Sequence, residues 1–325
     1  GQKKNNALPA KYSFKDICYT STCMQKAVEQ CRRVAKGDSS VMIYGETGTG
    51  KELFAQSIHN ASRRADGPFL AINCAAIPEN LLEGLLFGTE RGAYTGAERR
   101  AGLFEQANSG TLLLDELNSM NPNLQSKLLR VLESREFERV GGREIIPLRA
   151  GIIASTNQNL LAMSERRAFR ADLYYRLSTI ELYLPPLRAR PEDIPLLIDR
   201  LCAQKGGRLR LTSQAMEYLQ RYTWPGNVRQ LKNLVGRWLV FYDGVQITGR
   251  HVVDELTIGQ RSYNEAFGVT DPLAGTESPS GPASAPPPTL ADQERAALEQ
   301  ALAYAGGNRA LAARLLGISR TALYQ

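Results

Sequence analysis

The sequence predicts an α/β fold, in which a parallel β-sheet with helices on both faces is followed by a small helical lid and a C-terminal helix-turn-helix. From residue 41 to about 155, short apolar runs alternate with helix-forming segments, as strands and helices do in a parallel sheet. From residue 187 to 258 the pattern is helical throughout. Two more helical segments, joined by a glycine turn and leading into the start of a third, follow a stretch rich in Ser and Pro.

The bulk properties indicate a soluble protein with more than one domain. The chain has 325 residues, of which 43% are apolar, enough for a sizeable core. No apolar run approaches the roughly 20 residues that cross a bilayer, and no hydrophobic signal core opens the chain, so we expect a cytoplasmic protein without membrane contact. A formal charge of +7 permits binding of nucleotides and DNA without demonstrating it. Five cysteines without a C-x-x-C pair predict free, mostly buried thiols.

A glycine-rich turn connects the first predicted strand, 41–44, to the first helix of the sheet. Its glycines allow backbone N–H groups to converge on phosphate oxygens, and its lysine reaches the terminal phosphates of a nucleoside triphosphate. Glu52 departs from the generic P-loop, which has a hydroxyl there for magnesium. A turn that merely caps a helix is the alternative. The predicted nucleotide-binding residues are Gly45, Glu46, Thr47, Gly48, Thr49, Gly50, Lys51 and Glu52.

Polar residues follow two later apolar runs of the predicted sheet. The run 111–114 ends in Asp115 and Glu116, the Walker B position of a P-loop protein, where Asp115 holds Mg²⁺ and Glu116 polarises the attacking water. A helix cap that faces water is the alternative. The run 148–155 ends in Thr156 and Asn157, which are suited either to sensing the γ-phosphate or to capping the next turn. Another strand is predicted over 68–74, and helices over 22–35, 52–60, 78–87 and 124–133.

Three arginines are candidates for contact with phosphate. Arg170 and Arg176 lie six residues apart in an apolar surround, where guanidinium groups could complete the site of a neighbouring subunit or simply face solvent. Arg229 lies in the first turn of the last lid helix, placed either to reach the nucleotide or to remain an ordinary surface residue. The segment 88–98 consists of small and polar residues around Tyr94 and predicts a projecting loop, with a surface hairpin as the alternative.

These motifs resemble the bacterial enhancer-binding activators of sigma-54 RNA polymerase, a branch of the AAA+ ATPases, from about Tyr12 to Leu256. From Leu290 to Gln325 the chain is similar to the Fis-type helix-turn-helix of that family, with a plain helical hairpin as the alternative. The most specific match is to the family's Gly-Ala-Phe-Thr-Gly-Ala loop, with Tyr for Phe. That loop touches sigma-54, which implies the contact residues Gly92, Ala93, Tyr94, Thr95, Gly96 and Ala97. DNA contact is assigned to Ser319, Arg320, Thr321 and Tyr324.

The resemblance assigns further roles position by position. Glutamate is usual after the P-loop lysine in this family, and Asn73 matches an asparagine that restrains the Walker B glutamate. Thr156 and Asn157 match sensor I, Arg229 matches sensor II, and the segment 140–142 matches a second loop that supports the first. Arg170 and Arg176 match the arginine fingers. The expected domains are an AAA+ α/β subdomain (12–186), a helical lid (187–258), a flexible linker (259–289) and a truncated Fis-type module (290–325).

The function implied is that of an ATP-hydrolysing transcription activator with ATP and Mg²⁺ as cofactors. Subunits in a ring, expected to be hexameric, share ATP sites, and hydrolysis retracts the Tyr94 loop from sigma-54, which converts a closed promoter complex into an open one. Enhancer DNA binds the C-terminal module. Two alternatives remain on the residues: a AAA+ remodeller of another protein, and a DNA-binding regulator that uses nucleotide as a switch without turnover.

Overall fold

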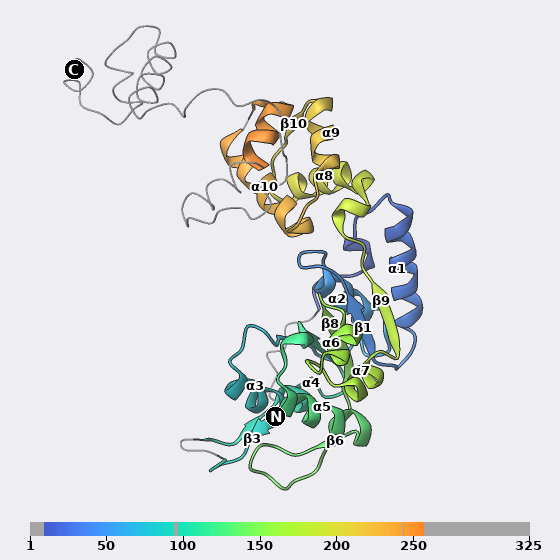
Figure 1. The fold of residues 1–325 in the computed structure, drawn as a ribbon, viewed down its shortest axis with the longest axis vertical. Coiled ribbons are helices and arrows are strands. Elements are labelled where there is room, and N and C mark those ends of the chain that lie inside the picture. Colours follow the sequence, from blue (N-terminus) through green and yellow to red (C-terminus); the bar gives the residue numbers. More distant parts are fainter. Residues whose placement is uncertain (1–9, 94–96, 243, 257–325) are drawn as a thin grey trace, which may run out of the picture. The chain divides into compact units, whose positions relative to one another are not determined.

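The computed structural model describes residues 10–93, 97–242 and 244–256. A five-stranded parallel sheet with the strand order β2-β5-β8-β1-β9 forms its α/β part (Figure 1). Its strands are β1 Val41–Tyr44, β2 Phe69–Asn73, β5 Thr111–Asp115, β8 Gly151–Thr156 and β9 Ile180–Tyr183. The predicted parallel sheet is confirmed, and β9 is an edge strand that the sequence analysis did not identify.

The register of the sheet gathers residues that are far apart in the sequence. Asn73 pairs with Asp115, and Tyr44 pairs with Thr156. Because parallel strands all end at the same edge of a sheet, the P-loop after Tyr44 begins beside these polar residues. Four separate segments therefore meet at one edge.

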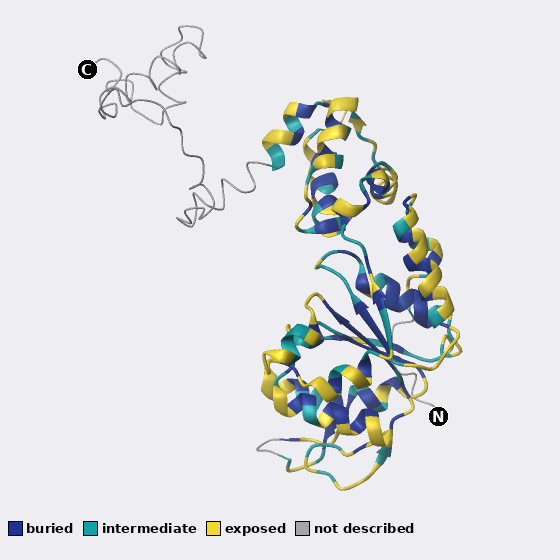
Figure 2. Cartoon of the chain, turned by 45° about the vertical axis from the view of Figure 1, so that its right-hand side comes forward, coloured by how far each residue is buried: buried dark blue, intermediate teal, exposed yellow. Residues whose placement is uncertain are grey.

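Alternating residues of the central strands pack on opposite faces of the sheet. Met42 belongs to one hydrophobic core and its neighbour Ile43 to the other. The predicted helices on both faces are confirmed, and Figure 2 shows the central strands as buried. One core packs against α1 Thr22–Val34 and α2 Lys51–Asn60. The other packs against α3 Glu79–Phe87, α4 Leu103–Ala107, α5 Pro122–Ser134, α6 Leu160–Glu165 and α7 Ala171–Leu177.

Two element boundaries differ from the predictions for identifiable reasons. Helix α5 begins two residues earlier than predicted, because the Asn121 side chain caps it by accepting from Leu124 N at 2.8 Å, and Pro122 suits the first position of a helix. Strand β8 begins at Gly151 rather than at Leu148, because Leu148 N donates to Arg135 O at 2.7 Å outside the sheet.

The lid is built around two tryptophans, Trp224 and Trp238, whose side chains are fully buried. Short 3-10 turns at Leu187–Ala189 and Pro191–Asp193 lead into three helices, α8 Ile194–Gln204, α9 Ser213–Arg221 and α10 Asn227–Phe241. The expectation of a purely helical lid is wrong in one detail, because β10 Arg210–Leu211 and β11 Gln246–Ile247 form a small parallel pair. That pair joins the loop before α9 to the segment after α10.

All five cysteines lie within the described residues and are free, as predicted. Cys31, Cys74 and Cys202 are buried, whereas Cys18 and Cys23 are partly exposed. Burial raises the pKa of Cys31 and of Cys74 to about 12, so neither thiol is a reactive thiolate. Within the described ranges, none of the helices combines the length and the apolar character that a bilayer span requires.

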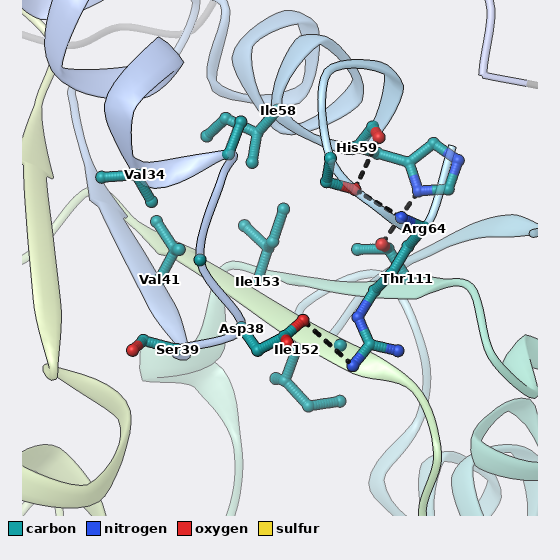
Figure 3. A pocket seen from close by; sticks show the side chains of 14 residues that line it. Val34, Asp38, Ser39, Val41, Ile58, His59, Arg64, Thr111, Ile152 and Ile153 are labelled. Carbon is teal, nitrogen blue, oxygen red and sulfur yellow. Dashed lines mark hydrogen bonds and ion pairs between the residues drawn. The ribbon is translucent and has the colours of Figure 1, made fainter. Parts of the chain in front are cut away.

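A small cavity of about 30 Å³ lies at the opposite edge of the sheet from the P-loop, where β1, β5 and β8 begin (Figure 3). His59 lies beside it, 1% exposed, with Nδ1 at 2.9 Å from Thr111 Oγ1. Burial lowers the pKa of His59 below its ordinary value of 6.5, and a hydrogen bond to the Gly67 backbone opposes this. The folded protein therefore favours neutral His59.

The burial of His59 leads to a prediction about acid stability. Because the folded pKa is below 6.5, the unfolded chain takes up the proton first, and stability falls as pH falls below 6.5. We expect His59→Asn to flatten the pH dependence of the urea unfolding midpoint between about pH 7 and pH 5. Thr111→Val removes the partner hydroxyl but not the titrating ring, so it should keep the steeper dependence. Equal slopes for both variants would contradict this interpretation.

Candidate functional site

The P-loop follows β1 in a conformation that depends on two glycines. Gly48 has φ +83° and Gly50 has φ +100°, both in the left-handed region that other residues rarely adopt. Gly50 is the last residue before α2, so the N-terminus of this helix faces the loop. Lys51 Nζ donates to Gly45 O at 2.9 Å, which folds the ammonium group back over the loop. The arrangement is a preformed cradle for phosphate.

A cavity of about 550 Å³ opens at the P-loop and brings several predicted residues together. Burial lowers the pKa of the Lys51 ammonium group, while the carboxylates of Asp115 and Glu116 oppose this shift and Arg229 adds to it. These charges are therefore close enough to act on one another. The predicted site residues that line the cavity are Thr47, Gly48, Thr49, Gly50, Lys51, Glu52, Asn73, Asp115, Glu116 and Arg229.

The rest of the cavity wall is formed by apolar, polar and charged residues that were not predicted from the sequence. Several apolar side chains come from the segment that leads into α1, from the first turn of α1 and from helix α8, about 180 residues later, and suit a flat heterocyclic base. No local motif marks them, because the wall exists only when the lid and the N-terminal segment fold together. They are Tyr12, Ile17, Cys18, Met24, Leu197 and Leu201.

Of the two Walker B carboxylates, Asp115 is the last residue of β5 and Glu116 follows it in a sharp turn. Asp115 Oδ1 accepts hydrogen bonds from the hydroxyl of Ser155 and from Glu116 N, the latter at 3.1 Å. Glu116 has φ 53°, a left-handed conformation that is uncommon for a residue with a side chain. Ser155, fully buried on β8, was not identified from the sequence, although it orients the predicted metal ligand.

Three other predicted polar residues have defined partners. Asn73 Oδ1 accepts from two backbone N–H groups of the turn after β2, at 2.8 and 3.2 Å, which leaves its NH₂ group for other contacts. Asn157 Nδ2 donates to Thr47 Oγ1 at 3.2 Å, so the structure brings Asn157 to the P-loop. Thr156 is fully buried, and its hydroxyl donates to Asn118 Oδ1 at 2.9 Å.

Arg170 and Arg176 do not line the cavity of their own chain. Both are exposed, one at the start and one near the end of α7. Arg170 makes two hydrogen bonds to Asp172, at 2.6 and 3.0 Å, which raise the pKa of the guanidinium group. Arg176 Nη2 donates to Leu132 O at 2.7 Å. The structure thus separates these arginines from the P-loop that their own chain provides.

The segment around the predicted projecting loop is a hairpin at its base. Strand β3, Gly88–Thr89, pairs antiparallel with β4, Arg100–Ala101, and Gly92 N donates to Ala97 O at 3.3 Å further along. The hairpin alternative is therefore correct for this base, which carries the predicted loop. Tyr94, Thr95 and Gly96 lie outside the described residues, as do the predicted DNA contacts Ser319, Arg320, Thr321 and Tyr324.

A second hairpin packs against the first. It consists of β6 Glu136–Phe137 and β7 Ile146–Pro147. Val140 joins the two hairpins, because its N–H donates to Gly88 O and its carbonyl accepts from Glu90 N, both at 3.0 Å. Gly141 has φ +75°, and a Cβ there would lie 2.7 Å from Ala93 Cβ, so only glycine allows this approach. The contact fits the supporting role expected of residues 140–142.

Arg139 forms an ionic anchor between the two hairpins and the α/β core. Its side chain is 11% exposed and makes ion pairs with Glu90 at 2.5 Å, with Glu105 on α4 at 2.6 Å and with Glu144 at 3.5 Å. Hydrogen bonding to Arg139 lowers the pKa of Glu90, so the pair is charged at neutral pH. Arg139 could not be predicted from the sequence, because its principal partners lie 34 and 49 residues away.

Three family models match the chain in succession: Sigma-54 interaction domain over residues 17–183, AAA+ ATPase lid domain over 188–267, and Bacterial regulatory protein, Fis family, over 289–325. A Nif-specific regulatory protein of Azotobacter vinelandii is 44% identical over 95% of this chain and 58% of its own length. The transcriptional activator RocR of Bacillus subtilis is 41% identical over 96% of this chain and 68% of its own length. The crystal structure of NtrX from Brucella abortus in complex with ATP matches 95% of this chain and 68% of NtrX with a TM-score of 0.69 and 34% identity.

The P-loop, the Walker B turn and the helical lid together define a AAA+ ATPase domain. The chain belongs to the family of sigma-54-dependent transcriptional activators, which confirms the resemblance drawn from its motifs. It carries the family's AAA+ domain and its Fis-type DNA-binding region. The chain spans little more than half the length of the Azotobacter protein, so the activity of a whole relative extends beyond the segment that matches.

Proposed function

We propose that this protein hydrolyses ATP in order to remodel a closed complex of sigma-54 RNA polymerase into an open one. The observation that carries this proposal is the bracing of the predicted sigma-54 loop: Val140, Gly141 and Arg139 hold its base against the same α/β unit that contains the P-loop cavity. A loop fixed in this way moves when the nucleotide site moves. The family assignment supports sigma-54 as the target.

ATP is the proposed substrate of the P-loop cavity. The preformed cradle, the apolar wall opposite it and the buried ammonium group of Lys51 suit a triphosphate with a flat base. NtrX, 34% identical to this chain, has been crystallised with ATP and with ADP. The donor set also fits Mg²⁺, because Asp115 supplies carboxylate oxygens beside the phosphate end. When bound there, Mg²⁺ would neutralise charge on the phosphate oxygens.

Each of the proposed site residues has a separate role in ATP hydrolysis. Lys51 and the P-loop N–H groups hold the phosphates, and Glu116 orients and polarises the attacking water. Asn73, paired in register with Asp115, restrains Glu116 until Asn157 and Thr156 respond to the γ-phosphate. Arg229 adds positive charge from the lid. Arg170 and Arg176 complete the site of a neighbouring subunit in a ring, proposed to be hexameric.

The proposed partners follow from two separate segments of the chain. Residues 92–97 contact sigma-54, and the region matched by the Fis family model binds enhancer DNA through Ser319, Arg320, Thr321 and Tyr324. Sigma-54 polymerase works in the bacterial cytoplasm, where we place this protein. Residues 259–289, rich in Pro and Ser, serve as a linker between the lid and the DNA-binding module.

A substitution in the loop tests the proposed function. We expect Tyr94→Ala to keep ATP turnover within about twofold of wild type and to abolish open-complex formation with sigma-54 polymerase, because the ring belongs to the proposed sigma-54 contact and not to the residues assigned to ATP. Tyr94→Phe keeps the ring and should open promoters normally. Open complexes are measured by permanganate reactivity of the melted DNA. Turnover that falls together with promoter opening in Tyr94→Ala would contradict the separation of the two roles.

A further inference from the structure

The loop that leads into α10 lies directly on the P-loop. Arg229 N donates to Gly48 O at 3.3 Å, and a Cβ built on Gly48 would lie 2.4 Å from Gly226 O. The lid backbone therefore touches the P-loop backbone without an intervening side chain. This contact is separate from any contact that the guanidinium group of Arg229 makes with a nucleotide.

Asn227 makes the most extensive of these contacts. Its side chain is fully buried, although its backbone has φ 49°, a conformation that asparagine tolerates better than most residues. Nδ2 donates to Thr47 O and to Glu46 Oε2, each at 3.1 Å, and Oδ1 accepts from Leu187 N at 2.8 Å. A single side chain thus connects the P-loop, the start of α10 and the segment that joins the lid to the sheet.

Arg188 reinforces the connection from that joining segment. Its two terminal nitrogens donate to the two carboxylate oxygens of Glu46 at 2.7 and 2.5 Å, a bidentate pair. Both side chains are partly exposed, 47% for Arg188 and 39% for Glu46, so solvent weakens this ion pair. The buried amide of Asn227 shares the same carboxylate, and we therefore regard Asn227 as the stronger of the two contacts.

The geometry fixes the direction of a phosphate-binding group. In a trans peptide the carbonyl and the N–H point in opposite directions, and the described residues contain no cis peptide bond. When Asn227 holds the Thr47 carbonyl, it also sets the direction of the Gly48 N–H, one of the donors that a P-loop offers to phosphate. Movement of the lid would release this carbonyl and allow that donor to turn.

We infer that Asn227, assisted by Arg188, is a positioning residue that keeps the P-loop in its phosphate-binding conformation and couples that conformation to the orientation of the lid. The inference rests on the proposed ATPase function, but it concerns nucleotide affinity rather than polymerase remodelling. Loss of the contact should weaken ATP binding, because the P-loop donor is no longer held in place. It should slow the chemical step less, because neither Asn227 nor Arg188 lines the cavity.

The test is Asn227→Asp, which keeps the size of the side chain and the acceptor for Leu187 N but removes both Nδ2 donors and places two carboxylates together. We expect the Kd of a fluorescent ATP analogue to rise by about 10- to 100-fold, since two hydrogen bonds are lost. KM for ATP should rise in parallel, and kcat at saturating ATP should stay within about threefold. Asn123→Asp, the same charge change at an exposed position of α5, is the matched control.

A second substitution separates positioning from a folding defect. Glu46→Gln added to Asn227→Asp reverses the hydrogen bond, since the new amide donates to the new carboxylate. The double variant should bind the analogue at least about threefold more tightly than Asn227→Asp alone. The inference would be overturned if the losses in affinity were additive in the double variant. It would also be overturned if Asn227→Asp had the Kd of the control variant, or lowered kcat at an unchanged KM. Binding is measured without polymerase and without turnover. A wild-type protein that binds the analogue but opens no promoter would therefore refute the proposed function and not this inference.

Discussion

Alanine in place of Arg170 or Arg176 is expected to lower ATP turnover by about 10³-fold, the usual value of an arginine that stabilises charge on a transferring phosphate. ATP affinity should change little, because both side chains are exposed and lie outside the cavity of their own chain. Arg166→Ala, which removes another exposed arginine near α7, should retain turnover and serves as the control. Turnover is measured at saturating ATP across a range of protein concentrations.

Mixing two inactive variants shows whether the arginines act on a neighbouring subunit. Arg176→Ala lacks the donated guanidinium group, whereas Lys51→Ala lacks the receiving P-loop. If the site is shared, a mixed ring contains some interfaces with both groups intact, and part of the turnover returns on mixing. If each arginine served the site of its own chain, every site in the mixed ring would lack either Arg176 or Lys51. No turnover would then return on mixing. Absence of recovery in rings that form normally would contradict the shared site.

The parts of the site that the sequence predicts are those encoded by local chemistry. The P-loop is one continuous segment, and Asp115 and Glu116 directly follow an apolar strand, so each is recognisable from its neighbours. The sheet then brings them together through register, as the pairing of Asn73 with Asp115 shows. Periodicity likewise predicts the central strands and the helices that cover both faces of the sheet.

The parts that the sequence does not predict depend on contacts between distant segments. Arg139 looks like any surface arginine until the fold places it between Glu90 and Glu105. Asn227 is the first residue of α10, where an asparagine looks like an ordinary helix-start residue, and its contacts with the P-loop span about 180 positions. The edge strand β9 is short and half polar, so its pattern lacks the continuous apolar run of the buried strands.

Glu116→Gln is expected to lower ATP turnover by about 10²- to 10⁴-fold while ATP binding is retained, because the amide keeps the size of the side chain but cannot accept a proton from water. Glu116 has φ 53°, and its carboxylate lines the cavity at the P-loop beside Asp115. Glu133→Gln, an exposed glutamate on α5, is the matched control and should behave as wild type.

Binding and turnover must be measured on the same Glu116→Gln sample, because the two readouts distinguish a chemical role from a structural one. If Glu116 polarises the attacking water, the variant binds ATP with an affinity near that of wild type and accumulates in the ATP-bound form. In the proposed mechanism hydrolysis retracts the Tyr94 loop, so binding of sigma-54 should then persist instead of cycling. Loss of ATP binding would assign Glu116 a role in holding the phosphates, and unchanged turnover would exclude it as the base.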